Sequence, residues 1–142
     1  MNTQPVKPTA TKPLIARGAL KVLLVDDDSF QLEMISGVLG ELGVLHVTPA
    51  TSGEQALQKL SGKHGFDLLL LDLQMPGMDG FKFMESVAKV GYTGALIIVS
   101  GQSDDVMHAA SMVAKLRRFT LLGTVPKPVG RSALSTLLSK IS

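Results

Sequence analysis

Cysteine and tryptophan are both absent from this chain of 142 residues, and long apolar runs are missing as well. Without cysteine, the chain has no disulfide framework and no thiolate metal site. Its apolar runs stop at about five residues, far short of the roughly 18 needed to cross a bilayer, so no membrane segment is expected. The N-terminus carries scattered Lys and Pro but no apolar signal-peptide core. These absences favour a single cytoplasmic globular domain.

The chain also has little net charge once its N-terminal segment is set apart. Lys7, Lys12 and Arg17 precede any acid, and without these three the remaining 11 Lys and Arg face 12 Asp and Glu. Residues 1–18 contain Pro and Thr without apolar periodicity, which predicts a flexible basic tail before a folded domain at 19–142. A domain with no basic excess and 4% aromatic residues is not expected to contact nucleic acid.

Beyond the tail, short apolar runs alternate with segments of helical periodicity. Apolar side chains recur at i, i+3, i+4 and i+7 from Ile35 to Leu42, as in an amphipathic helix. The expected strands are 21–26, 44–49, 67–72, 95–100 and 120–125, and the expected helices are 29–42, 53–62, 81–90, 104–118 and 131–141. This alternation predicts a flavodoxin-like (βα)5 fold of the α/β class, a three-layer sandwich with parallel sheet order 2-1-3-4-5.

Polar residues follow four of these strands. Asp26 and Asp27 end the first, Asp72 the third, Ser100 the fourth and Lys127 the fifth. The carboxyl ends of parallel strands meet at one edge of a sheet, where ligands bind. Carboxylates, a hydroxyl and an ammonium gathered there suit a phosphoryl group and a hard cation, Mg²⁺ or alternatively Mn²⁺.

Each of these residues has an ordinary explanation when taken alone. The acids of the first cluster can cap the next helix, with Asp28 the best candidate, and Lys127 can be a solvated loop residue. Asp72 can begin a turn, but an acid at the end of a leucine-rich central strand has no packing role. A carboxylate there can act as a nucleophile toward phosphorus.

The motifs Val-Asp-Asp at 25–27, Leu-Leu-Leu-Asp-Leu-Gln-Met-Pro-Gly-Met-Asp-Gly at 69–80, Val-Ser-Gly at 99–101 and Lys-Pro at 127–128 closely resemble those of response regulator receiver domains. The resemblance implies a phosphoacceptor of two-component signalling rather than an enzyme with a separate substrate. A sensor histidine kinase or histidine phosphotransfer protein would be the donor. The roles that it implies are phosphoacceptor for Asp72, Mg²⁺ ligands for Asp26, Asp27, Asp72 and the Gln74 carbonyl, and phosphoryl contact and switching for Ser100, Gly101 and Lys127.

The same resemblance implies a cis peptide bond before Pro128 and a switch surface on the fourth helix, fifth strand and fifth helix, which is also a candidate dimer surface. Family members usually carry an aromatic residue where this chain has Thr124, so we expect a smaller rearrangement or a different readout surface. The segment from 94 to 101 looks similar to receivers that precede EAL-type cyclic-di-GMP phosphodiesterase domains. A C-terminal output domain of that type is therefore a further hypothesis.

Two other functions remain open at this point. A small Mg²⁺-dependent phosphohydrolase resembling the haloacid dehalogenase superfamily would use Asp26 as nucleophile and Asp28 as its partner. That hypothesis leaves the 69–80 motif unexplained, and Phe30 stands where Thr or Val is expected. A flavodoxin-like FMN binder would need a Ser, Thr or Gly-rich phosphate loop where the chain has three acids.

Overall fold

Five parallel strands form one sheet with the order β2-β1-β3-β4-β5, as the sequence predicts. The computed structural model describes residues 14–62, 65–75, 79–101 and 104–142. The strands are β1 (Lys21–Val25), β2 (His46–Ala50), β3 (Leu68–Asp72), β4 (Ala95–Ser100) and β5 (Thr120–Pro126). The helices are α1 (Ser29–Glu41), α2 (Gly53–Leu60), α3 (Gly80–Lys89), α4 (Asp104–Leu116) and α5 (Arg131–Leu138). Among these, no helix combines the length and apolarity needed to span a membrane.

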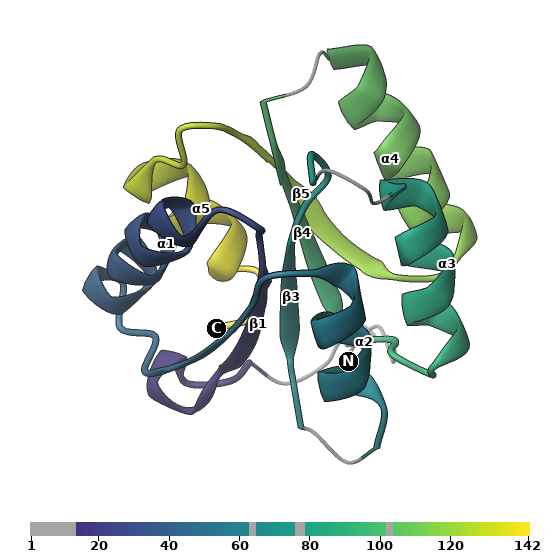
Figure 1. Ribbon diagram of the computed structural model, residues 1–142. Helices are drawn as coiled ribbons and strands as arrows, with labels where there is room; N and C mark the ends of the chain where they lie inside the picture. The colour runs from purple at the N-terminus through teal and green to yellow at the C-terminus, as the bar shows by residue number, and fades with distance from the viewer. Residues whose placement is uncertain (1–13, 63–64, 76–78, 102–103) are drawn as a thin grey trace, which may run out of the picture.

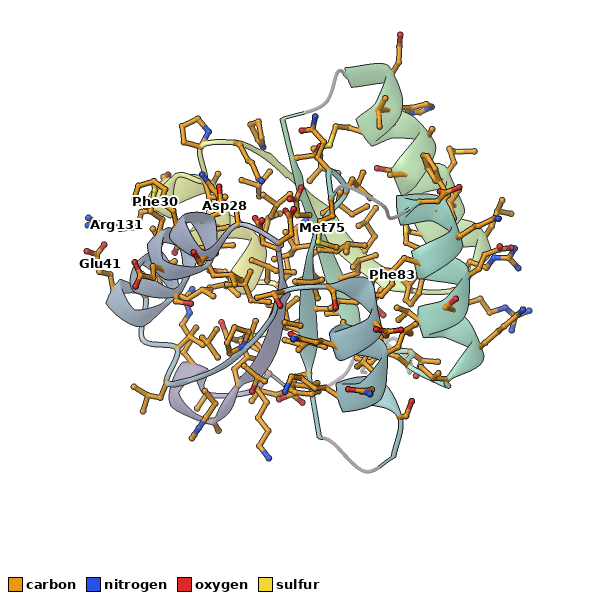
Figure 2. The ribbon with its side chains drawn as sticks, in the orientation of Figure 1. Asp28, Phe30, Glu41, Met75, Phe83 and Arg131 are labelled. Carbon is orange, nitrogen blue, oxygen red and sulfur yellow. The ribbon has the colours of Figure 1, made fainter. Side chains whose placement is uncertain are left out.

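The helices cover the sheet on both sides, which makes three layers (Figure 1). Helices α1 and α5 lie on one face, and α2, α3 and α4 lie on the other. Figure 2 shows the contrast between two phenylalanines: Phe83 of α3 is buried against the sheet, whereas Phe30 of α1 is exposed to solvent. The predicted flavodoxin-like architecture is therefore confirmed.

Strand β3 is the centre of the sheet and explains its leucine-rich sequence. Strand β1 pairs with one edge of β3 and β4 pairs with the other, and helices cover both faces of the sheet. All five residues of β3 are therefore buried. A central parallel strand is covered on both faces, so every position except the last is filled by leucine. The last position is Asp72, which the register places opposite Val99 of β4.

Short polar residues precede three of the helices as N-caps and determine the residue at which each helix begins. The side chains of Asp28, Ser52 and Asp79 accept hydrogen bonds from backbone N–H groups in the first turns of α1, α2 and α3. Element ends differ from the predictions by up to three residues, the largest case being α5, which ends at Leu138.

Residues 14–18, which the sequence assigns to the tail, are attached to the domain. The Ile15 N–H donates a hydrogen bond to the Ile141 carbonyl at 2.9 Å, and Arg17–Ala19 forms a short 3-10 helix. The Arg17 guanidinium donates to the Leu42 and Ser135 carbonyls and to the Ser139 and Ser142 hydroxyls. Its positive charge lies at the C-terminal ends of α1 and α5, where the helix dipoles favour a cation. A flexible tail stays a prediction for residues 1–13.

Candidate functional site

Three carboxylates meet at the carboxyl edge of the sheet. Asp26 follows β1 and Asp72 ends β3, and these two strands are direct neighbours. Asp26, Asp27 and Asp72 each contribute one carboxylate oxygen to a cluster. These three oxygens all lie within 4.8 Å of one another. Asp26 and Asp72 are 1% and 2% exposed, whereas Asp27 is open to solvent. The fold thus brings together the acids that the sequence predicts to converge.

The Asp72 carboxylate is held by two hydrogen bonds. Its Oδ1 accepts from the Gln74 backbone N–H at 2.9 Å, and its Oδ2 accepts from Lys127 Nζ at 3.0 Å. Burial raises the pKa of Asp72, and the charge of Asp26 adds to that effect, while the two hydrogen bonds oppose it. Asp72 is therefore a fixed carboxylate in a place that disfavours its negative charge.

Lys127 supplies the positive charge between the two buried acids. Its Nζ lies 3.0 Å from Asp72 Oδ2 and 3.3 Å from Asp26 Oδ2. Burial acts to lower the pKa of the ammonium, but the hydrogen bond and charge of Asp72, together with Asp26, outweigh it and raise the pKa above its usual value. The Lys127 N–H donates to the Ser100 carbonyl, and the peptide bond from Lys127 to Pro128 is cis.

The donor set at this edge fits a hard divalent cation. Asp26 Oδ1 accepts from the Asp28 N–H at 3.0 Å, but Asp26 Oδ2 is buried and accepts no well-oriented hydrogen bond from the described residues. A buried carboxylate oxygen that has an ion pair at 3.3 Å but no well-oriented hydrogen bond is costly. Because Lys127 carries one positive charge and the three carboxylates carry three negative charges, the cluster keeps an excess of negative charge. All three acids offer oxygen ligands, and Asp27 keeps one side open to water, as Mg²⁺ prefers.

The other candidate residues lie on β4, β5 and the segments that follow β3 and β4. Ser100 is buried at the end of β4, beside the end of β3. Gln74 and Gly101 are exposed and adjacent, since a Cβ added at Gly101 would lie 3.5 Å from Gln74 Oε1. Thr124 is half-buried in β5, opposite Ile98 of β4.

Two features of the site bear on the sequence hypotheses. Asp28 Oδ1 accepts from the Phe30 N–H at 2.9 Å, so Asp28 is a helix cap, and it is not one of the three clustered acids. This placement disfavours the phosphohydrolase hypothesis, which pairs Asp28 with Asp26. The contact of Lys127 with Asp26 is not evident from the sequence, because β5 and β1 are separated by two strands and no spacing rule connects them.

Comparisons with known proteins agree with this geometry. Residues 22–139 match the family described as response regulator receiver domain. The chain is 33% identical over 99 residues to the chemotaxis protein CheY of Bacillus subtilis, covering 68% of this chain and 82% of that protein. It is 32% identical over 117 residues to the autoinducer 1 sensor kinase/phosphatase LuxN of Vibrio campbellii. That match covers 82% of this chain but only 13% of the sensor kinase, so it concerns a small part of the larger protein.

Solved structures give the same result for the fold. A response regulator from Colwellia psychrerythraea superposes with a TM-score of 0.72 at 26% identity, covering 84% of this chain and 94% of that one. A response regulator receiver domain protein from Clostridium thermocellum superposes with the same TM-score at 25% identity, covering 86% of this chain and 93% of that one.

Proposed function

The chain belongs to the family of response regulator receiver domains, and from this premise we propose that it accepts a phosphoryl group on Asp72. The observation that carries the proposal is the environment of this one carboxylate. It is buried at the switch point of the sheet, hydrogen-bonded by Lys127 and grouped with Asp26 and Asp27. A site with this charge pattern suits a phosphoryl group that arrives with a divalent cation.

The transfer that we propose is a single displacement at phosphorus. One Asp72 carboxylate oxygen forms the new P–O bond, and the P–N bond of a donor phosphohistidine breaks. The bonding electron pair stays on the imidazole nitrogen, and a proton from solvent keeps the ring neutral. The Lys127 ammonium, now 3.0 Å from Asp72 Oδ2, can contact an oxygen of the transferred group as a point charge.

Mg²⁺ is the cofactor that fits the donor set, with Mn²⁺ as the alternative. Asp26, Asp27 and Asp72 would hold it, and the Gln74 backbone carbonyl is a further proposed ligand. When bound, the ion neutralises charge on the phosphoryl oxygens. Asp26 Oδ2, which lies 3.3 Å from Lys127 Nζ but accepts no well-oriented hydrogen bond from the described residues, would then gain a second cation.

The donor that we propose is a sensor histidine kinase or a histidine phosphotransfer protein. Support comes from the family membership and from the LuxN relative, whose name describes a sensor kinase. Phosphorylation would bias the surface of α4, β5 and α5, since Ser100 ends β4 beside the site and Lys127 follows β5. Control of an output, whether an EAL-type domain or a separate partner, and dimerisation through this surface stay predictions.

Intact-mass analysis tests the phosphoacceptor directly. The chain is treated with phosphoramidate, whose P–N bond resembles that of phosphohistidine, and separately with acetyl phosphate. We expect a gain of one phosphoryl group that requires Mg²⁺ and is abolished by Asp72→Asn. Asp28→Asn is the matched control, because it removes a nearby acid that lies outside the three-carboxylate cluster.

The result that contradicts the proposal is a phosphoryl gain that survives Asp72→Asn. It would mean a different nucleophile, with Asp26 of the phosphohydrolase hypothesis the first to test. Complete absence of a gain in the folded, Mg²⁺-loaded chain with either reagent would also contradict it. Unchanged amide exchange across residues 101–130 after phosphorylation would exclude the proposed switch surface but leave the phosphoacceptor intact.

A further inference from the structure

A cavity opens at the amino edge of the sheet, the edge opposite Asp72 and the lower one in Figure 1. Its volume is about 340 Å³, which lies in the range of small-molecule sites. Apolar surface forms most of its wall, and the lining residues also include one carboxylate and three hydroxyl-bearing side chains. The lining includes Ile15, Phe66, Asp67, Tyr92, Thr120 and Ile141.

The Tyr92 ring is the fixed part of this wall. Tyr92 is buried, and its hydroxyl donates to the Ala95 carbonyl at 2.7 Å. The ring fits only because residue 94 is glycine, since a Cβ there would lie 2.7 Å from the Tyr92 hydroxyl oxygen. The Phe119 ring lies beside it, with centroids 6.4 Å apart. The cavity therefore has a preformed aromatic side.

Asp67 gives the cavity its charge. Its Oδ2 accepts from the Lys21 backbone N–H at 2.9 Å, and within the described ranges no Lys, Arg or His side chain forms an ion pair with it. Burial raises the pKa of the Tyr92 hydroxyl, and the negative charge of Asp67 raises it further. The negative charge of Asp67 thus acts on the aromatic wall, and the cavity combines an apolar surface with a carboxylate that has no ion pair among the described side chains.

We propose that this cavity binds a small organic cation, namely an amine carried on an apolar body of about the size of one aromatic ring. The apolar body would lie between Phe66, Tyr92 and Ile141, and the ammonium would pair with Asp67. A neutral analogue would lose the ion pair, and an anion would be repelled by the same carboxylate. The site lies at the other edge of the sheet from Asp72, so it does not depend on the proposed phosphotransfer.

Phenethylamine is the probe, titrated into the full chain and followed by the backbone amide signals of residues 91–95 and Thr120. We expect saturable shifts there, and roughly tenfold weaker binding of 2-phenylethanol, which has the same body without the charge. Asp67→Asn should remove this preference, because the amide can still accept from the Lys21 N–H but carries no charge. Asp105→Asn, an exposed acid on α4, is the matched control and should leave amine binding unchanged.

Several outcomes would overturn the proposal. Equal binding of the amine and the alcohol would remove the role of Asp67, and so would an unchanged preference in Asp67→Asn. If Asp67→Asn does not fold, Thr120→Trp at the exposed rim of the cavity is the second test. The larger side chain should block the cavity and abolish amine binding, and unchanged amine binding would overturn the proposal. Dimerisation of the free chain through these residues, or amine binding only after removal of residues 1–13, would mean that protein occupies the cavity. Asp72→Asn should bind the amine normally, which separates this proposal from the phosphoacceptor.

Discussion

The two edges of the sheet surround their acidic side chains with different partners. At the carboxyl edge, Asp26 and Asp72 are buried together and share one ammonium, that of Lys127. At the amino edge, Asp67 has no cationic partner among the described side chains and stands beside an apolar wall. The first edge has too many acids for its one base, and the second has one acid beside a cavity.

The difference shows how one fold can hold two independent kinds of site. Charges at the carboxyl edge repel one another strongly unless a cation is added, which supports the proposed binding of a metal ion and a phosphoryl group there. The amino edge is set by packing, since Gly94 allows Tyr92 to form the wall. Removal of a charge should therefore cost the most stability at the first edge, and a change of side-chain volume should cost the most at the second.

The largest effect is expected for Lys127→Ala. Removal of the ammonium leaves two buried carboxylates unpaired, which should lower the free energy of unfolding by about 3 kcal/mol in the absence of divalent cations. Mg²⁺ should restore part of this loss, because an ion that binds only the folded state stabilises it. Urea denaturation with EDTA and with Mg²⁺ measures both quantities.

Lys82→Ala is the control for this prediction, since it removes an exposed lysine of α3 and should change the stability by less than about 0.5 kcal/mol. A Lys127→Ala protein as stable as the wild type in EDTA would show that solvent, not the lysine, compensates the two acids.

Gly94→Ala should have the next largest effect, about 2 kcal/mol of destabilisation, because the new Cβ forces the Tyr92 ring and its hydrogen bond out of place. Gly40→Ala is the control: this helical glycine has open space around its missing Cβ, and the change should stabilise the chain by about 0.5 kcal/mol. Thermal denaturation compares the two variants. Equal stability of both would mean that the Tyr92 wall adapts freely.

Asp72 should give a smaller effect, visible in the pH dependence of stability. Its pKa is raised in the folded state above the usual 3.8, so the folded chain holds this proton more tightly than the unfolded chain. Stability should therefore fall as the pH rises above about 3.8, with a slope of at most about 1.4 kcal/mol for each pH unit. Asp72→Asn should remove this fall. Urea denaturation between pH 3 and 7 in EDTA measures it, and identical slopes for the two proteins would contradict the assignment.

The carboxyl edge can be predicted from the sequence because it depends on chain topology. Once five βα units are recognised, the parallel sheet places the residues after β1 and β3 side by side, and this brings Asp26 to Asp72. The leucine-rich run of β3 identifies the central strand for the same reason. Local sequence patterns therefore predict contacts between distant residues wherever those contacts follow from the order of the strands.

The cavity at the amino edge cannot be predicted from the sequence, because it depends on how side chains pack. Nothing in the local pattern indicates that the Tyr92 hydroxyl turns back to Ala95, although the single tyrosine of the chain followed by Gly94 is a signal to test elsewhere. Composition places Arg17 in the tail, but its hydrogen-bond partners are Leu42, which follows α1, and residues in and after α5. Contacts between the two ends of a chain have no periodicity by which to predict them.

The smallest effect, about 1 kcal/mol, is expected for Arg17→Ala at the amino edge. The guanidinium donates four hydrogen bonds to uncharged acceptors, but it is half-exposed, so water can replace much of what is lost. Arg131→Ala is the control, since its ion pair with Glu41 is largely exposed and should contribute less than about 0.5 kcal/mol. Denaturation measures both variants, and amide exchange at Ile15 reports the local opening. If Arg17→Ala slows phosphorylation of Asp72 as well, the two edges communicate through α1 and α5; an unchanged rate means that each edge works alone.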